Sequence, residues 1–255
     1  MKKLVYSILI FMIIATIGSC VKKDNYVGPN QILTGAVIDS STGQPIQTEV
    51  GTSSLQIRAY EMTWNNGVGV VPENFNVHYD GTFANTKVFA GTYKLYPTDG
   101  AFAPLVYTNS AGTPVDNGSK TITIQGGTTN VSFTVSPFLK VEWVADPVVN
   151  ADKTVTVQFK FSRGTAIPDR IFNVTDAFLF VSTAEFVSNA SYDNLTSTQV
   201  TYSGTAGNAL LGQPITLTTK ALGANRPYYV RVGARTADNV NKRYNYNAPK
   251  QVHIP

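Results

Sequence analysis

Residues 222–232, Leu222-Gly-Ala-Asn-Arg-Pro-Tyr-Tyr-Val-Arg-Val232, contain the pattern that decides the fold of the C-terminal half. A leucine stands six residues before Tyr228, and Val230 and Val232 then fall on every second position. A period of two is typical of a strand that buries one face. The stretch therefore predicts a strand whose valines enter a core and whose Tyr228 hydroxyl reaches the backbone upstream.

This pattern resembles the tyrosine corner of fibronectin type III and immunoglobulin-like sandwiches. Two earlier segments, 138–144 (FLKVEWV) and 154–161 (TVTVQFKF), alternate cleanly, and turn residues such as Asp146-Pro147 lie between them. Further strands are predicted at 177–181, 200–202, 215–219 and, as an edge strand, 247–254. About seven short strands between turns is the count that the resemblance implies for a β-sandwich. We assign this domain to residues 137–255.

The residues before this domain predict a second all-β unit, over residues 31–136. Its strands are predicted at 55–60, 74–78, 92–96, 120–124 and 130–135. Asp80-Gly81-Thr82-Phe83 and residues 125–129 (QGGTT) each predict a β-hairpin. Asp39 heads a Ser-Ser-Thr-Gly turn, where a carboxylate accepts backbone N–H groups, and we favour this role over a catalytic one.

Four motifs in this unit resemble the carboxypeptidase regulatory-like domain. They are Leu33-Thr-Gly-Ala-Val-Ile-Asp39, Thr42-Gly-Gln-Pro-Ile46, Asp80-Gly-Thr-Phe83 and Ala90-Gly-Thr-Tyr93. The resemblance implies a prealbumin-like β-sandwich of a kind common in Bacteroidetes surface proteins, and it implies no catalytic residue. The predicted fold class is thus all-β, with two tandem β-sandwich domains.

The N-terminus has the parts of a secretory signal. Lys2 and Lys3 precede an apolar run, 4–17, which is shorter than the ~20 residues that a membrane-spanning helix needs. Ile17-Gly-Ser-Cys20, with the only cysteine of the chain, resembles a bacterial lipobox. That resemblance implies removal of residues 1–19, lipidation of Cys20 and a tether over residues 20–30. An uncleaved membrane anchor with an incidental cysteine is the alternative.

The composition argues against nucleic acid as a partner and against disulfide bonds as a source of stability. Without Lys2 and Lys3, 18 of the 20 basic residues remain against 16 acidic residues, and they form no cluster. A nucleic-acid-binding surface is expected to show clustered Lys and Arg, so no nucleic acid is expected as a partner. With Cys20 lipidated, no cysteine is left for a disulfide, and the fold must depend on hydrophobic burial.

The sequence has few of the features that a catalytic or metal site requires. The two histidines, His78 and His253, fall in different domains, whereas a catalytic zinc needs about three clustered ligands. We therefore predict no metal, no cofactor and no enzyme activity. Calcium held by Asp and backbone oxygens stays open, although no D-x-D-x-D run is present. No G-x-S-x-G motif occurs, and Glu61 and Glu142 are the acids that turns do not explain.

Aromatic residues in irregular segments are the better functional signal. Sugars stack their C–H faces on Trp and Tyr, while amides and carboxylates hold the hydroxyls. The candidate ligand-binding residues are Trp64, Asn65, Tyr107, Tyr244 and Tyr246. The alternative is that these aromatics cap the cores or pack between the domains. Trp143 lies in an alternating strand and is predicted to be core.

The order of lipobox, first domain and C-terminal sandwich resembles a family of Bacteroidetes lipoproteins of unknown function. Such proteins are often encoded beside starch-utilisation-like transport pairs. The resemblance implies an accessory lipoprotein of the outer membrane, with the membrane, a polysaccharide and an outer-membrane transport complex as partners. We expect it at the cell surface, and the periplasmic face is the alternative. The rival functions are a structural or adhesive spacer and an enzyme with two carboxylates in a cleft.

Overall fold

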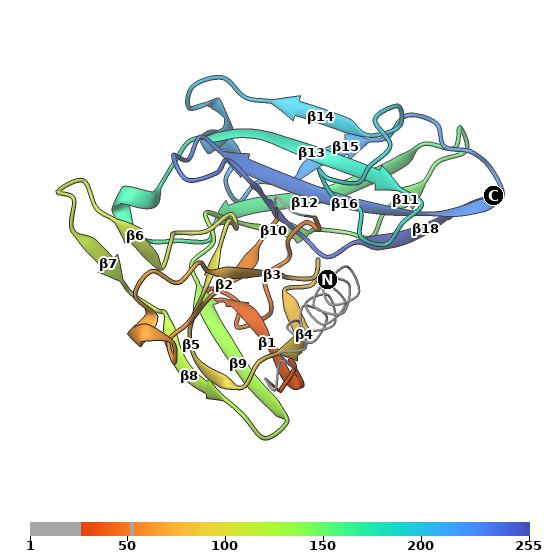
Figure 1. Cartoon of the computed structure of the whole chain (residues 1–255). Coiled ribbons are helices and arrows are strands. Elements are labelled where there is room, and N and C mark those ends of the chain that lie inside the picture. The colour runs from red at the N-terminus through yellow and green to blue at the C-terminus, as the bar shows by residue number, and fades with distance from the viewer. Residues whose placement is uncertain (1–26, 52–53) are drawn as a thin grey trace, which may run out of the picture.

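The computed structural model describes residues 27–51 and 54–255, and within them the protein is all-β. The predicted signal, the lipidation site Cys20 and most of the tether lie outside the described residues. Two β-sandwich domains follow one another along the chain (Figure 1). In the described part of the chain, no helix is long and apolar enough to cross a membrane.

The N-terminal domain has two sheets facing one another, with orders β4-β1-β9 and β3-β2-β5-β8, and a separate β6-β7 pair. Strands β1 and β9 are parallel, in register from Ile32↔Thr128 to Asp39↔Val135. The strands are β1 (Gln31–Asp39), β2 (Gln56–Glu61), β3 (Glu73–Asn76), β4 (Thr82–Val88), β5 (Gly91–Thr98), β6 (Val106–Thr108), β7 (Pro114–Asp116), β8 (Lys120–Ile124) and β9 (Thr128–Val135).

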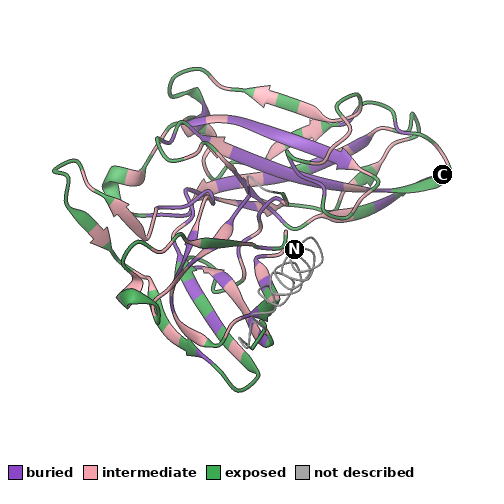
Figure 2. Ribbon diagram, viewed as in Figure 1, coloured by how far each residue is buried: buried purple, intermediate pink, exposed green. Residues whose placement is uncertain are grey.

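Alternating apolar residues of both sheets fill the core of this domain. In β9, Val131, Phe133 and Val135 are buried while the residues between them face solvent (Figure 2). In β1, a Cβ placed on Gly35 would lie 1.7 Å from the carbonyl oxygen of Val131. The Leu-Thr-Gly motif therefore has a physical reason, because only glycine allows β1 to approach β9 this closely.

Neither predicted hairpin pairs the strands that flank it. Strand β8 pairs with β5, whereas β9 pairs with β1, so residues 125–127 cross from one sheet to the other. The Asp80-Gly81 turn does form, with the Gly81 amide 3.0 Å from the His78 carbonyl oxygen, but β3 and β4 then join different sheets. Both predictions were wrong because a connection between sheets uses the same turn residues as a hairpin.

The turn role of Asp39 is confirmed. Its Oδ1 accepts hydrogen bonds from the amide and the hydroxyl of Ser41, each at 2.7 Å. The Gly43 amide also donates to the Asp39 carbonyl oxygen at 2.8 Å. The carboxylate is thus used to close the turn after β1.

The C-terminal domain packs a sheet of order β10-β12-β11, with β15 on β12, against a sheet of order β14-β13-β16-β17, with β18 on β16. Short 3-10 helices occupy Pro168–Arg170 and Ala206–Leu210. The strands are β10 (Leu139–Trp143), β11 (Val148–Val149), β12 (Val155–Arg163), β13 (Val174–Ser182), β14 (Thr198–Thr201), β15 (Ile215–Thr218), β16 (Arg226–Thr236), β17 (Tyr244–Tyr246) and β18 (Lys250–Ile254).

The predicted tyrosine corner is confirmed at the start of β16. The Gly223 amide donates a hydrogen bond to the Tyr228 hydroxyl at 3.0 Å, and Arg226 Nε donates to the same oxygen at 2.6 Å. Val230 and Val232 are fully buried in the core between the two sheets. The predicted core residue Trp143 is only partly buried, and its indole N–H donates to the Ala248 carbonyl oxygen at 2.9 Å.

Arg231 fixes the two domains to one another. Its guanidinium is fully buried and donates hydrogen bonds to the carbonyl oxygens of Thr48 (2.8 Å) and Tyr79 (3.3 Å) in the N-terminal domain. It also donates to the Asn247 and Val187 carbonyl oxygens in its own domain. Burial lowers the pKa of Arg231 to about 10, so the group stays charged at neutral pH and its hydrogen bonds are charge-assisted.

Candidate functional site

The five predicted ligand-binding residues lie in three separate places. Trp64 and Asn65 follow β2, Tyr107 lies in β6, and Tyr244 and Tyr246 lie in β17. Tyr107 is half-buried, with the guanidinium carbon of Arg170 at 5.1 Å from the centre of its ring. These residues do not form a single site.

Trp64 begins a loop that exposes apolar side chains. The side chain of Trp64 is 73% exposed, and those of Val68 and Val71 are 69% and 84% exposed. Scattered exposed apolar residues are ordinary, but several on one short loop are typical of a binding surface. The described part of the loop thus offers a large aromatic face to solvent.

The backbone of the loop is built to hold this shape. A 3-10 turn covers Asn65–Gly67, with positive φ at Asn65 (46°) and Gly67 (77°). Gly67 is favoured because its positive φ is one that side chains with a Cβ rarely adopt, and the Met62 side chain packs against the turn, with its sulfur 2.6 Å from where a Cβ on residue 67 would lie. The position of Trp64 is therefore set by its neighbours in the chain.

Glu61, at the end of β2, clamps the start of the loop. Its Oε1 accepts the Thr63 amide at 2.8 Å and its Oε2 accepts the Trp64 amide at 3.0 Å. Thr63 in turn accepts the Thr92 amide of β5 at 2.9 Å, which ties the loop to the sheet. Burial raises the pKa of Glu61, but the hydrogen bonds from Thr63 and Trp64 outweigh burial and leave that pKa below its usual value.

A hollow of about 300 Å³ lies beside this clamp. Its wall has two carboxylates, Glu61 and Glu73, and its remaining lining is mainly apolar or aromatic. The lining residues are Ala59, Glu61, Val70, Val71, Glu73, Phe89, Ala90 and Tyr93. We call this the Glu61 hollow. Apolar surface with a few polar groups is the usual composition of a ligand pocket.

Glu61 does not have the properties of a glycosidase's general acid. A glycosidase needs one carboxyl group with a raised pKa to protonate the leaving oxygen. The pKa of Glu61 is lowered, and both of its oxygens already accept backbone amides. Glu61 is therefore suited to orient the loop and to accept hydrogen bonds, and not to donate a proton.

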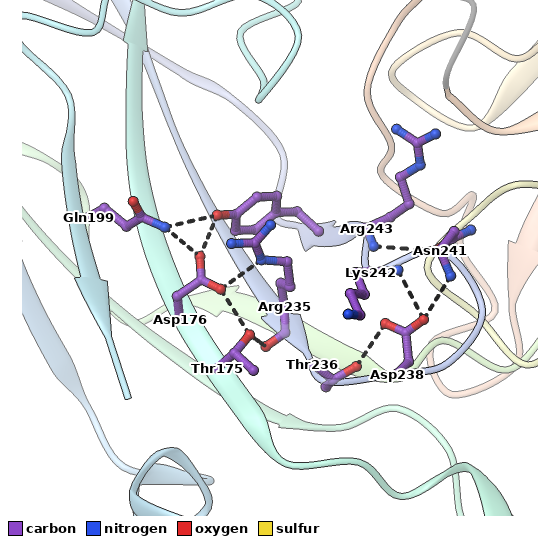
Figure 3. A network of polar contacts seen from close by, with 10 residues as sticks. Thr175, Asp176, Gln199, Arg235, Thr236, Asp238, Asn241, Lys242 and Arg243 are labelled. Carbon is purple, nitrogen blue, oxygen red and sulfur yellow. Dashed lines mark hydrogen bonds and ion pairs between the residues drawn. The ribbon is translucent and has the colours of Figure 1, made fainter. Parts of the chain in front are cut away.

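Tyr244 and Tyr246 are only 5% exposed, which leaves little of either ring for a ligand. The Tyr244 hydroxyl donates a hydrogen bond to Asp176. The same carboxylate also accepts hydrogen bonds from Arg235 Nε at 2.7 Å and Gln199 Nε2 at 2.8 Å (Figure 3). Burial, and then the bond to Asp176, raises the pKa of Tyr244. Tyr244 is thus part of a buried polar network, and we leave it out of the candidate site.

Tyr246 belongs to the junction between the domains. Its hydroxyl donates to Glu49 at 3.0 Å, and Glu49 also pairs with Arg243 at 2.9 Å. The guanidinium carbon of Arg231 lies 4.4 Å from the centre of the Tyr246 ring. Residues of the segment 242–247 thus hold the two domains together.

The β16–β17 turn is shaped by a second buried carboxylate. Asp238 accepts the amides of Asn241 at 2.9 Å and Lys242 at 3.0 Å (Figure 3). It also accepts the amide of Val240 at 3.0 Å. Asn241 Nδ2 then donates to the Gly100 carbonyl oxygen of the N-terminal domain at 2.9 Å. This carboxylate is fully used by the turn. Among the described residues, no group of three His, Cys, Asp or Glu side chains is placed to hold a metal ion.

Sequence reasoning missed several residues that define these places. Glu73 and Val71 line the Glu61 hollow, yet their sequence neighbourhood carries no motif. Arg231 lies between two buried valines, where alternation predicts a solvent-facing side chain. A basic residue between two valines of a core strand was the available signal for a buried partner at this position.

Comparison with known proteins gives two consecutive family matches. Residues 31–136 match the N-terminal domain of DUF3823, a protein family of unknown function, and residues 144–251 match its C-terminal domain, DUF3823_C. A comparison with curated proteins finds no match.

Solved structures agree with these matches. A DUF3823 family protein from Bacteroides uniformis has 32% identity and a TM-score of 0.80, over 89% of this chain and 100% of that one. A second protein from Bacteroides uniformis, described as a candidate carbohydrate binding protein, has 20% identity and a TM-score of 0.70, over 89% and 100%. A DUF3823 family protein from Parabacteroides merdae has 18% identity and a TM-score of 0.63, again over 89% and 100%.

Proposed function

The chain belongs to the DUF3823 family, and we propose that it is a non-catalytic glycan-binding protein whose site is the Trp64 loop with the Glu61 hollow. One observation carries the proposal: an exposed tryptophan whose backbone amide is held by a carboxylate that also lines a hollow. Aromatic faces bind the C–H faces of sugars, and carboxylates accept hydrogen bonds from their hydroxyls.

The expected strength of such a site is modest. A sugar ring that stacks on Trp64 removes on the order of 100 Å² of apolar surface from water, which contributes about 2.5 kcal/mol. Part of this is offset by the cost of association. We therefore expect weak binding to single sugars and stronger binding to polymers, which present many equivalent rings to the same site.

The sequence supports a location of the protein at a membrane. The lipobox-like Ile17-Gly-Ser-Cys20 supports a lipid anchor, and several acyl chains hold a protein more firmly than one chain does. We propose an outer-membrane lipoprotein, facing the cell surface, that supports a polysaccharide-uptake complex. The description of one structural neighbour as a candidate carbohydrate binding protein agrees with this proposal.

The test is a polysaccharide screen by affinity gel electrophoresis with the full chain in detergent. Retardation by one or more neutral polysaccharides is the expected result. Trp64→Ala is compared with Leu195→Ala, which removes another exposed apolar side chain, from the C-terminal domain. Equal retardation of the two variants would place any glycan site elsewhere on the protein.

The two rival functions, a rigid spacer and an enzyme, predict different experimental results. A rigid spacer is favoured by the fixed junction at Arg231, and it predicts no retardation by any polysaccharide. An enzyme predicts release of reducing ends during long incubation, with loss of that activity in Glu61→Gln and Glu73→Gln. We expect no such release from the wild type.

A further inference from the structure

We propose that the Glu61 hollow selects neutral saccharides and rejects those that carry carboxylate or sulfate groups. This inference rests on the proposed function, and it adds the class of glycan that the site takes. Glu73 is the residue to which we assign this selectivity.

The charged side chains that line the hollow are all negative. Glu61 and Glu73 both line it, and no Lys, Arg or His is among the lining residues. Strands β2, β3 and β5 supply lining residues, and their two basic residues are held elsewhere: Lys94 pairs with Asp116 at 2.7 Å, and Arg58 donates to Asn74 at 3.2 Å. No described cation is thus placed in the wall to receive an anionic sugar.

The hydrogen-bonding capacity of the hollow agrees with its charge. An ionised carboxylate only accepts hydrogen bonds, so the ligand has to supply the donors. Sugar hydroxyl groups supply them, whereas a uronate or a sulfate ester at the same point brings only acceptors and a like charge. Glu61 stays ionised because backbone amides stabilise its charged form.

The two carboxylates have different tasks. Both Glu61 oxygens accept amides of the loop, so its removal would change the position of Trp64 as well as the charge. Glu73 is an exposed residue at the start of β3, and its side chain forms no hydrogen bond or ion pair with another described residue. Glu73→Gln therefore removes one negative charge while the loop keeps its clamp.

The expected effect is measurable. An anionic group held at roughly 6 Å from both carboxylates in water is repelled enough to weaken binding about tenfold. Because the groups are exposed, salt screens this repulsion. The difference between neutral and acidic ligands should thus shrink at high ionic strength.

The experiment uses three pairs of polymers, each with a neutral and an acidic form. They are starch and carboxymethyl starch, hydroxyethyl cellulose and carboxymethyl cellulose, and methyl-esterified and de-esterified homogalacturonan. Binding of the full chain in detergent is measured by affinity electrophoresis at low and high salt. The variants are Glu73→Gln and, as a control with the same change in charge in the other domain, Asp169→Asn.

The expected result is that a neutral polymer binds and its acidic partner binds about tenfold more weakly at low salt. This ratio should fall in Glu73→Gln and at high salt, and should stay unchanged in Asp169→Asn. Equal or tighter binding of the acidic form, or an unchanged ratio in Glu73→Gln, would overturn the selectivity while leaving glycan binding in place. Failure of all six polymers to bind would overturn the proposed function, and this inference with it.

Discussion

Arg231 of the C-terminal domain donates a hydrogen bond to the carbonyl oxygen of Thr48 in the N-terminal domain, at 2.8 Å and out of contact with solvent. The same guanidinium binds three other backbone carbonyls and stacks on Tyr246. Because this buried cation has acceptors in both domains, it holds the two sandwiches together. It thereby fixes the orientation of the N-terminal domain relative to the C-terminal domain.

Loss of Arg231 should be strongly destabilising. Arg231→Met removes the donor for four backbone carbonyls, and each buried carbonyl left without a partner typically costs about 1–3 kcal/mol. Chemical denaturation should show this loss, and the two domains should then unfold in separate steps. Arg170→Met, a partly exposed arginine on the Tyr107 ring, is the control and should cost under about 1 kcal/mol. A single unfolding step of wild-type stability in Arg231→Met would contradict the account.

The tyrosine corner should contribute a smaller, local share of stability. Tyr228→Phe leaves the Gly223 amide and Arg226 Nε without their acceptor and should lower the free energy of unfolding by about 1–2 kcal/mol. Tyr229→Phe, at the next position, loses one exposed bond from Gln251 and should change it by less than about 0.5 kcal/mol. Equal losses in the two variants, measured by urea denaturation, would argue against the corner.

Asp116 should contribute to stability in a pH-dependent way. Its bonds from Lys94 and then Ser119 hold its pKa well below the usual 3.8. A carboxylate with a depressed folded-state pKa stabilises the fold above its unfolded-state pKa, and this is lost as pH falls below about 4. Asp116→Asn should therefore lose stability relative to wild type at pH 6 and lose less of it at pH 3. A constant difference across this range, measured by urea denaturation, would remove Asp116 as the cause.

Cys20 should decide whether the protein partitions with membranes. Cells grown with radiolabelled palmitate should label the wild type, and the labelled protein should enter the detergent phase on Triton X-114 separation. Cys20→Ala should give no label, because the lipid is attached through the thiol. Labelling of Cys20→Ala would show that the lipobox-like motif is not the attachment site.

The regular parts of the fold could be predicted because one face of each strand is buried. Alternation placed β12 and β16 within a few residues of their observed bounds, and the Leu222–Tyr228 spacing predicted a specific hydrogen bond. The sheet to which each strand belongs could not be predicted. Gly126 and Gly127 adopt positive φ in the connection between β8 and β9, which lie in different sheets, and the same glycines would be equally suited to a hairpin within one sheet. Strands of two or three residues, such as β11 and β17, are too short to show a period.

The candidate site was predictable only in its local part. Trp64 among polar loop residues was a visible signal, but the Glu61 hollow joins β2, β3 and the β4–β5 connection, which meet only after folding. Tyr244 and Tyr246 gave the same sequence signal as Trp64, yet both are buried. The Tyr244 hydroxyl donates to Asp176 and the Tyr246 hydroxyl donates to Glu49, and both carboxylates come from distant segments of the chain. Their burial depends on long-range contacts that a single sequence does not encode in any local pattern.

The central claim is that Trp64 provides the stacking face of a glycan site, and calorimetric titration of the polysaccharide that binds most strongly in the screen tests it most directly. The account predicts that Trp64→Ala raises the dissociation constant at least about tenfold, corresponding to about 1.4 kcal/mol, with an unchanged melting temperature. Leu195→Ala should match the wild type. A dissociation constant for Trp64→Ala equal to that of the wild type, in a fully folded protein, would contradict the account.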